Sequence, residues 1–379
     1  MNVPFLDLKA QYRSIKSEVD PRIQEVIDNT AFVMGRFLNE FEQQFAAYQG
    51  LKHMIGTNSG TSALAIALLA LQEHDAKDWP AGKWEAVVPA NTFIATAEAV
   101  VQAGGRPVFA DIDEHTYNLT AHTAKAAITE NTRVIIPVHL YGQPAPMDEI
   151  MQLANKYNLM VLEDCAQAHG AKYKHNGAWT NVSTYGHAAG FSFYPGKNLG
   201  AYGDGGAVGT NVESIAEYIT MYRDHGSKIK YEHRFVGSTD RLDSMQATIL
   251  GVKLKHLDDW NNKRRENSKL YAKHFSGVDE VIVPHLPDYA LPVWHLYVIR
   301  VEDRMGLQKF LSDNGIGCGF HYKYPLHLQP AFSYLGYKEG DFPVTEKVMN
   351  EIISLPMFAE LTEEQINYVV EMVKKFLVK

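Results

Sequence analysis

Short apolar segments rich in strand-forming residues alternate with longer helical segments through the first two thirds of the chain. The apolar segments are nearly continuous, which is typical of strands that helices cover on both faces. This alternation predicts an α/β layer with a mostly parallel sheet flanked by helices. The predicted strands are Glu85–Pro89, Pro107–Ala110, Val134–Val138, Leu159–Glu163, Ala189–Phe193 and Gly206–Thr210, and the predicted helices are Leu38–Tyr48, Thr61–Gln72, Ala95–Ala103, Met147–Tyr157 and Val212–Arg223.

The pattern changes in the last third of the chain. Met245–Phe275 predicts one long helical region, Trp294–Val301 a strand and Gly306–Asp313 a helix, and the last 20 residues predict an amphipathic helix. We therefore expect a smaller C-terminal α+β domain. The expected division places residues 1–245 in a large α/β domain with an N-terminal segment, and residues 246–379 in a connecting helix and the small domain.

Composition narrows the class of protein. A hydrophobic content of 46% and a charged content of 21% predict a folded chain, and the net charge of −8 gives no reason to expect nucleic acid as a partner. The start shows no signal-peptide pattern, and the most apolar run, Ala63–Leu71, is shorter than the ~18 residues of a membrane span. Cys165 and Cys318 make neither a disulfide framework nor a metal cluster, so we expect a reducing, cytoplasmic setting and no metal. Because no apolar run is long enough to span a membrane, we expect no membrane contact either.

Small residues precede the helix predicted from Thr61. The segment Thr57–Leu64 reads Thr-Asn-Ser-Gly-Thr-Ser-Ala-Leu. Free backbone N–H groups at a helix N-terminus, together with the helix dipole, can hold a phosphate. The alternative is an ordinary N-cap, in which Ser59 or Thr61 satisfies the donors of its own helix.

Two carboxylates, Glu163 and Asp164, close the apolar strand that ends at Glu163. In open α/β sheets the carboxyl ends of parallel strands are where ligands bind. A carboxylate there can hold a proton on a pyridine nitrogen and so strengthen the ring as an electron sink. The alternative is a solvated strand end.

Lys197 lies in a constrained turn, because Pro195 and Gly196 precede it and Gly200 follows shortly after. Lysine forms Schiff bases with carbonyl groups and loses its proton readily when buried. Most lysines are solvated surface charges, but a surface lysine rarely lies in so constrained a turn. A phosphate cradle, a strand-end carboxylate and a lysine in a rigid turn are the three parts that a pyridoxal phosphate (PLP) site requires.

The order of motifs resembles the nucleotide-sugar aminotransferases, the DegT/DnrJ/StrS group of fold-type-I PLP enzymes. This resemblance covers nearly the whole chain. It implies the fold-type-I architecture and PLP, with its amine form PMP, as the cofactor. The matching motifs are Pro4–Leu8, Asn58–Thr61, Pro89–Thr96, Pro137–Gly142, Glu163–Gly170, His321–Tyr322 and Pro325–Pro330.

The resemblance implies a role for each matching residue around the cofactor ring. Lys197 would bind the cofactor as a Schiff base and then move protons. Asp164 would pair with the pyridinium nitrogen. Phe93 would lie against the ring face, or else is a plain core aromatic. Gln167 would reach the ring hydroxyl, or else is a buried amide that caps a loop.

The resemblance also implies a phosphate site and a substrate site. Ser192, Gly60 and Thr61 would hold the cofactor phosphate. His321 and Tyr322 match a segment that lines the sugar-nucleotide pocket of the family, although a single histidine is more often structural.

Two positions depart from the family pattern. Family members usually carry an asparagine at the position of Thr239, in the segment Gly237–Arg241, and it reaches the phosphate of the partner subunit. The threonine leaves that contact in doubt in the homodimer that the family implies. His187 stands where aspartate is common, and the sequence offers no account of it.

The resemblance implies ping-pong transamination, in which glutamate is the amino donor and a nucleotide-linked keto sugar is the acceptor. The segment His225–His233 resembles members that aminate C3, which favours a dTDP-linked 3-keto-6-deoxyhexose. The amino sugar would enter polysaccharide, glycan or antibiotic biosynthesis. C4 amination is the alternative. Three other functions fit the sequence less well. A PMP-dependent dehydratase of this family would carry histidine at position 197. An enzyme with a cysteine nucleophile would need a better placed residue than Cys165, and a non-catalytic sensor would be expected to lose Lys197 or Asp164.

Overall fold

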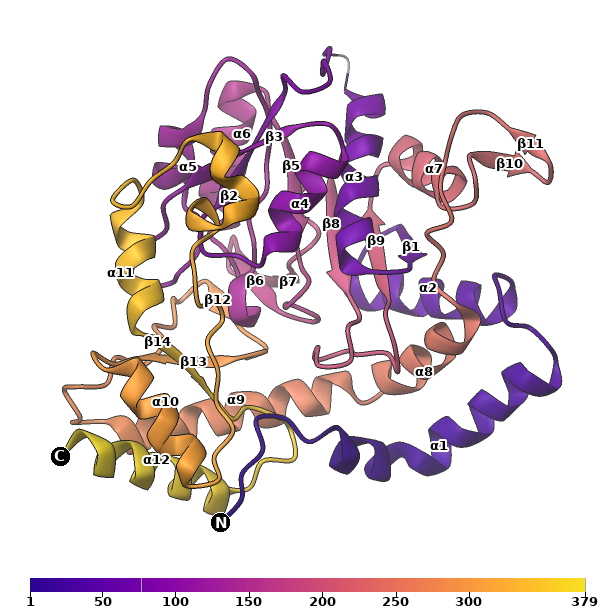
Figure 1. Ribbon diagram of the computed structural model, residues 1–379. Coiled ribbons are helices and arrows are strands. Elements are labelled where there is room, and N and C mark those ends of the chain that lie inside the picture. Colours follow the sequence, from indigo (N-terminus) through magenta and orange to yellow (C-terminus); the bar gives the residue numbers. More distant parts are fainter. Residues whose placement is uncertain (76, 379) are drawn as a thin grey trace.

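The computed structural model describes residues 1–75 and 77–378. Its centre is a seven-stranded sheet in the order β1-β9-β8-β5-β4-β2-β3 (Figure 1). Neighbouring strands are parallel except at β9, which runs antiparallel to both β1 and β8. The strands are β1 (His53–Thr57), β2 (Glu85–Pro89), β3 (Arg106–Ala110), β4 (Thr132–Ile135), β5 (Met160–Asp164), β8 (Ala188–Ser192) and β9 (Gly206–Thr210).

The mostly parallel α/β sheet confirms the predicted fold class, and six of its strands were predicted within a few residues of their ends. Strand β1 was not predicted, because His53 and Gly56 interrupt its short apolar run. The reversed direction of β9 was not predicted either, since a run of apolar residues carries no information on strand direction.

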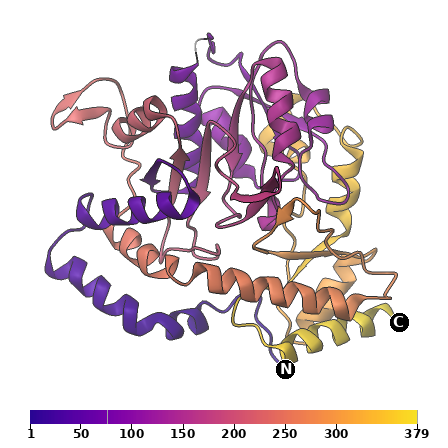
Figure 2. The same cartoon turned by 180° about the vertical axis from the view of Figure 1, so that it is seen from behind.

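Helices cover both faces of the sheet, and each face has its own apolar core (Figures 1 and 2). Alternation along the strands divides the side chains between the two cores: Val87 and Val161 enter the first, and Val88 and Leu162 enter the second. The first core is covered by α2 (Arg36–Gln49), α5 (Ala121–Ala127) and α6 (Met147–Tyr157), and the second by α3 (Gly60–His74), α4 (Ile94–Gln102) and α7 (Glu213–Tyr222).

The helical region predicted over Met245–Phe275 is confirmed, but it is not one connecting helix, because the chain forms α8 (Ser244–Leu254) and α9 (Leu257–Phe275) with a break between them. The two helices serve different cores. Apolar residues of α8, such as Leu250, pack in the first core of the sheet, whereas Tyr271 of α9 packs in a separate C-terminal core. The break lets the apolar side chains of α8 and those of α9 enter these two different cores.

The C-terminal part of the chain is built on β13 (Tyr297–Arg300) and β14 (Ile352–Leu355), which pair antiparallel. Helices α10 (Arg304–Asp313) and α12 (Glu363–Leu377) cover this pair and share its apolar core. The division at residue 245 stays a prediction. The other elements are α1 (Leu8–Asp28), β6 (Lys172–His175), β7 (Ala178–Asn181), β10 (Ser227–Ile229), β11 (Glu232–His233), β12 (Ala290–Leu291), α11 (Pro343–Glu351) and the 3-10 helices Leu140–Gly142, Leu326–Leu328 and Pro330–Leu335.

The start of the chain joins this C-terminal core. Val3 is fully buried in it and forms a parallel β-bridge with Ile316. Within the described residues, no helix combines the length and apolar character that crossing a membrane requires.

Candidate active site

Lys197 lies in the loop between β8 and β9, and backbone contacts hold this loop closed. The Lys197 N–H donates to the carbonyl of Tyr194 at 2.8 Å, and the Ala201 N–H donates to that of Phe193 at 2.8 Å. A Cβ on Gly200 would lie 2.3 Å from the Pro195 carbonyl oxygen, so the turn requires glycine there. The loop therefore presents the lysine from a rigid turn, as its sequence predicted.

The Lys197 amine faces opposing influences. Desolvation by the surrounding protein lowers its pKa from 10.5 to about 8, and the nearby charge of Asp164 acts in the opposite direction. Burial dominates, so a substantial fraction of the amine is unprotonated slightly above neutral pH. An uncharged amine is the form that attacks a carbonyl group.

Asp164 ends β5 and is almost fully buried, so the alternative of a solvated strand end is wrong. Its Oδ2 accepts a hydrogen bond from the Thr96 hydroxyl at 2.8 Å, and its Oδ1 accepts one from the Ala166 N–H at 3.1 Å. Burial raises the pKa of Asp164, whereas these hydrogen bonds and the charge of Lys197 act to lower it. The carboxylate keeps lone pairs free to meet a further donor from the cavity.

The N-terminus of α3 lies directly against the end of β8. Ser59 is the N-cap, and its Oγ accepts the Ser62 N–H at 3.1 Å. Gly60 and Thr61 are the first two residues of α3, and their N–H groups have no partner within the helix. A Cβ on Gly60 would lie 2.6 Å from the Cβ of Ser192, so glycine lets the Ser192 hydroxyl approach this helix end. The helix is capped, as the alternative predicted, and it still offers the free donors on which the phosphate prediction depends.

Phe93, Gln167 and Tyr322 meet on one wall of the cavity. Phe93 is 51% exposed, so it is not a plain core aromatic, and its ring centroid lies 5.4 Å from that of Tyr322. The Gln167 Oε1 accepts the Tyr141 N–H at 2.6 Å, and its Nε2 donates to the Tyr322 hydroxyl at 3.0 Å. Gln167 thus caps a loop, as the structural alternative predicted, while it also faces the cavity.

His321 is held from three sides. Its ring stacks on Phe5 with centroids 5.5 Å apart, its Nδ1 pairs with the Ser354 hydroxyl at 2.9 Å, and its carbonyl oxygen accepts a hydrogen bond from the Tyr141 hydroxyl. Burial, with a smaller effect of the Lys197 charge, lowers the pKa of His321 to about 4. The ring is therefore neutral at physiological pH.

These side chains surround one cavity of about 600 Å³, a volume typical of small-molecule sites. All the predicted site residues line it: Gly60, Thr61, Phe93, Asp164, Gln167, Ser192, Lys197, His321 and Tyr322. Sequence reasoning missed several others, among them Phe5, Leu6, Thr96, Tyr194 and His295. Phe5, Leu6 and Thr96 lay within the matching motifs and Tyr194 lay two residues after Ser192, but His295 gave no local signal.

The two departures from the family pattern lie outside this cavity lining. The Thr239 hydroxyl contacts the ring of His225, at 3.0 Å from Nε2. The Nδ1 of His187 accepts the Val161 N–H at 3.0 Å, and burial lowers the pKa of His187. His187 therefore supplies a side-chain acceptor for a backbone N–H where β5 and β8 begin to pair.

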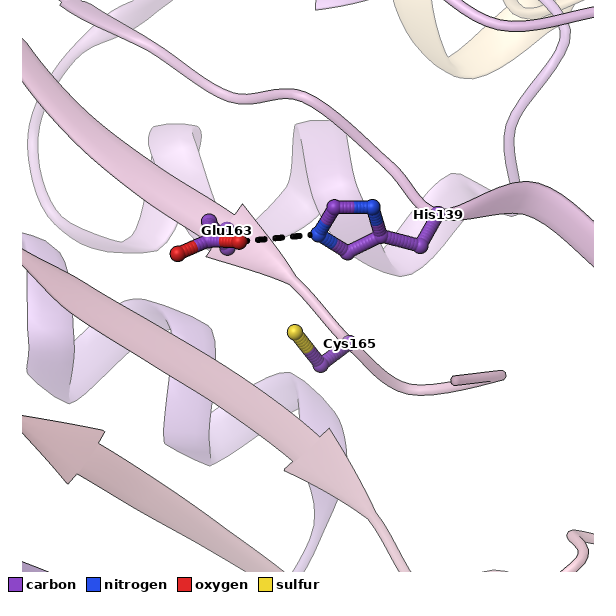
Figure 3. Close-up of side chains that lie close together, drawn as sticks. All are labelled: His139, Glu163 and Cys165. Atoms are coloured by element: carbon purple, nitrogen blue, oxygen red, sulfur yellow. Dashed lines mark hydrogen bonds and ion pairs between the residues drawn. The ribbon is translucent and has the colours of Figure 1, made fainter. Parts of the chain in front are cut away.

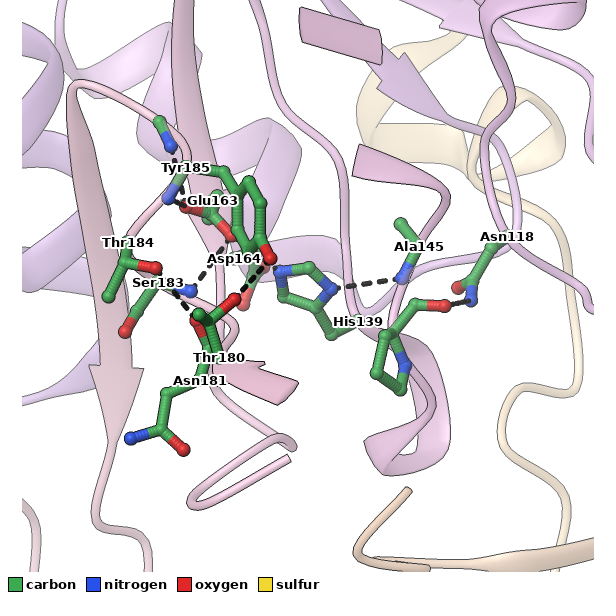
Figure 4. Close-up of polar contacts among 12 residues, drawn as sticks. Asn118, His139, Ala145, Glu163, Asp164, Thr180, Asn181, Ser183, Thr184 and Tyr185 are labelled. Atoms are coloured by element: carbon green, nitrogen blue, oxygen red, sulfur yellow. Dashed lines mark hydrogen bonds and ion pairs between the residues drawn. The ribbon is translucent and has the colours of Figure 1, made fainter. Parts of the chain in front are cut away.

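Glu163, the carboxylate beside Asp164, points away into a buried cluster with His139 and Cys165 (Figure 3). Its Oε1 accepts the N–H groups of Tyr185 and Gly186 at 2.9 and 2.7 Å. Its Oε2 accepts the Ser183 N–H at 2.9 Å and the His139 Nε2–H at 3.0 Å (Figure 4).

The Nδ1 of His139 in turn accepts the Ala145 N–H at 3.0 Å, so both ring nitrogens are occupied. Each oxygen of Glu163 already accepts two hydrogen bonds, and burial raises the pKa of the Cys165 thiol well above its ordinary value. These groups lack the free lone pairs and the thiolate that a metal site needs. The cluster is structural, and it ties the end of β5 to the loops that flank it.

Comparisons with known proteins agree with this geometry. The model of the DegT/DnrJ/EryC1/StrS aminotransferase family matches residues 13–374. The chain is 46% identical over 378 residues to a pleiotropic regulatory protein of Geobacillus stearothermophilus, covering 99% of both chains. It is 40% identical to the dTDP-3-amino-3,4,6-trideoxy-alpha-D-glucose transaminase of Streptomyces venezuelae, covering 99% of this chain and 96% of the other.

Among solved structures, the crystal structure of S. venezuelae DesV in complex with a ketimine intermediate aligns with a TM-score of 0.94. The two sequences are 39% identical, and the alignment covers 100% of this chain and 99% of the other. The family model, the relatives and the structural neighbour agree from one end of the chain to the other, and the chain belongs to the DegT/DnrJ/EryC1/StrS aminotransferase family.

Proposed function

We propose that this enzyme transfers the amino group of glutamate to a dTDP-linked 3-keto-6-deoxyhexose, with PLP as its cofactor. Several relatives, the Streptomyces venezuelae enzyme among them, are named as aminotransferases of nucleotide-linked sugars, and the donor and the sugar are the proposed refinement. The observation that carries the proposal is a lysine with a pKa of about 8 in the same cavity as a buried carboxylate. Lys197 and Asp164 supply the amine and the acceptor that a pyridine aldehyde needs.

The donor set of the cavity fits PLP. The free N–H groups of Gly60 and Thr61 and the hydroxyl of Ser192 suit a phosphate, and the close approach at Gly60 leaves no room for a side chain there. Phe93 is exposed to the cavity and suits the face of an aromatic ring.

The residues of this chain divide the chemistry among them. When bound, PLP supplies the electron sink that lets the C–N bond be broken and remade. Lys197 would hold the cofactor through its amine and, when free, would carry a proton at Nζ between the substrate carbon and the cofactor. Asp164 would hold a proton on the ring nitrogen. Tyr322 and His321 would bind the sugar nucleotide.

We further propose a homodimer with shared sites. The family likeness supports it, and so do apolar side chains on the segment that contains β10 and β11, which projects from the rest of the chain (Figure 1). In this segment Tyr231 is 84% exposed and Val236 is 94% exposed. Light scattering during gel filtration tests the assembly, and a monomer at micromolar concentration would contradict it.

A regulatory role is the second candidate, because the Geobacillus relative bears the name of a regulatory protein. A sensor without catalysis has no need of a reactive lysine or of a carboxylate for the ring nitrogen. Both Lys197 and Asp164 are present and face one cavity, which favours the enzyme.

The absorbance of the purified protein distinguishes these candidates. We expect a band from lysine-bound PLP that bleaches when glutamate is added, and we expect Lys197→Ala to lack both the band and all turnover. The substitution removes no core volume, so circular dichroism should be unchanged. A protein that binds PLP but never bleaches with glutamate or other amino donors would support the sensor instead.

A screen of keto sugar nucleotides with glutamate, read by mass spectrometry, tests the substrate. It should include dTDP- and UDP-linked sugars with the ketone at C3 or at C4. Amination of the 3-keto-6-deoxyhexose linked to dTDP is the expected result, and preference for a 4-keto sugar would replace that assignment.

A further inference from the structure

His295 lines the cavity, yet the proposed mechanism gives it no task. It lies in the segment between β12 and β13, next in the chain to Leu296, which also lines the cavity. The residues that suit the cofactor come instead from the strand ends and loops of the central sheet. His295 therefore belongs to a part of the lining that no proposed cofactor contact uses.

The protonation of the His295 ring follows from a chain of hydrogen bonds that begins at a backbone carbonyl. The His169 carbonyl oxygen can only accept, so the atom of Asn261 at 2.9 Å from it is the amide nitrogen. The Asn261 amide oxygen then faces Asn198, whose Nδ2 donates to it at 2.9 Å. A second donation from the same Nδ2 goes to the Val293 carbonyl at 2.9 Å.

With both N–H groups of its amide engaged, Asn198 turns its oxygen toward His295. The distance from Oδ1 to the ring Nδ1 is 3.3 Å. Two acceptors would repel each other at this distance, so Nδ1 carries the proton. Asn198 and Asn261 are buried, which leaves water little chance to relieve a wrong orientation.

A neutral imidazole that is protonated at Nδ1 has a bare lone pair at Nε2. Burial, and after it the charge of Lys197, lowers the pKa of His295 well below its ordinary value, so the ring stays neutral. Nε2 has no hydrogen-bond partner within the described part of the chain. It is not fully buried, since it keeps some accessible surface. It is therefore an acceptor open to the cavity.

We propose that His295 is a substrate-binding residue whose Nε2 accepts a hydrogen bond from a hydroxyl group of the sugar. This inference rests on the proposed function for the identity of the ligand. A hydroxyl is the donor that suits a bare imidazole nitrogen, and a site built to bind a hydroxyl discriminates strongly against an analogue that lacks it.

Nuclear magnetic resonance of the holoenzyme with 15N-labelled histidine tests the tautomer without any turnover. We expect a protonated Nδ1 and a bare Nε2 on His295, assigned by the signal that His295→Asn removes. A proton on Nε2 overturns the inference whatever sugar the enzyme uses.

Two matched variants test the contact. His295→Gln keeps an acceptor near the position of Nε2 and loses the bond to Asn198, whereas His295→Asn keeps a donor near Nδ1 and loses the acceptor. We expect His295→Asn to lower kcat/KM for a dTDP-linked 3-keto-6-deoxyhexose roughly 10- to 100-fold, with His295→Gln retaining most of the wild-type value.

Stopped-flow measurement of each half-reaction locates the loss. In His295→Asn the rate with the sugar should fall at least 10-fold more than the rate with glutamate. Equal losses in both half-reactions, or equal losses in the two variants, overturn the inference. Failure of the proposed function is a separate result, since the wild-type enzyme would then aminate none of the sugars.

Discussion

The chemistry at the residue scale depends on how burial acts on two charged groups of opposite sign. Desolvation lowers the pKa of Lys197 and raises that of Asp164, while the attraction between the two opposes both shifts. The amine is thus made reactive by its surroundings, and the nearby carboxylate limits how far its pKa falls.

The reactivity of Lys197 in the cofactor-free enzyme should follow pH with a midpoint near 8. Above this pH the native amine is bare, whereas the unfolded chain keeps its proton up to about 10.5. The unfolded state therefore binds more protons between these values, and this group adds to stability as pH rises from 8 to 10.5. The rate of PLP uptake, followed by absorbance, should rise through the same midpoint.

Asp164→Asn supplies the control for this profile. It removes the charge that raises the pKa of Lys197, so the midpoint of PLP uptake should move to lower pH. Turnover should fall by several orders of magnitude, because the ring nitrogen loses the partner that keeps it protonated. A wild-type midpoint near 10.5, or near-normal turnover in the variant, would contradict the assignment of this pair.

At the scale of elements, the proposed phosphate cradle depends on how closely the start of α3 approaches the end of β8. Gly60→Ala would place a Cβ 2.6 Å from the Cβ of Ser192 and push the two apart. We expect PLP to dissociate more readily, measured as the concentration that half-saturates the cofactor-free protein.

Gly251→Ala is the matched control, since the nearest atom to its Cβ would be the Gln44 Oε1 at 3.5 Å. Gly251 lies inside α8, so alanine there should raise the free energy of unfolding by about 0.5–1 kcal/mol and leave PLP affinity unchanged. Wild-type PLP affinity in Gly60→Ala would show that the cradle lies elsewhere.

The buried cluster around Glu163 should stabilise the fold without touching the cavity. Glu163→Gln would direct an amide N–H against backbone N–H donors, because both carboxylate oxygens already accept two hydrogen bonds. We expect the free energy of unfolding to fall by about 1–3 kcal/mol in urea titrations. The exposed Glu266→Gln on α9 should change little, and equal stability of the two variants would argue against the cluster's role.

At the scale of the whole molecule, the first residues connect the C-terminal core to the cavity. Val3 is buried in that core, while Phe5, two residues on, stacks on His321 and lines the cavity. Val3→Ala should lower the free energy of unfolding by about 2 kcal/mol through lost burial. Val378→Ala, at a side chain that is 89% exposed, should change it by less than about 0.5 kcal/mol. Equal unfolding midpoints would place the start of the chain outside the core.

The sequence by itself determined the α/β pattern and the turn around Lys197, because burial periodicity and turn chemistry are written in neighbouring residues. Most candidate residues of the site came instead from the resemblance of the motifs to a family. The family of the chain was predicted and is confirmed. The roles of the individual site residues stay predictions.

Only the tertiary structure decided the direction of β9, the break between α8 and α9, the opposite surroundings of Glu163 and Asp164, and the task of His187. It also decided the state of His295, whose proton is placed through Asn198 and Asn261. The physical reason is shared: strand direction, desolvation and hydrogen-bond orientation depend on groups that are distant in the chain and meet only when it is packed.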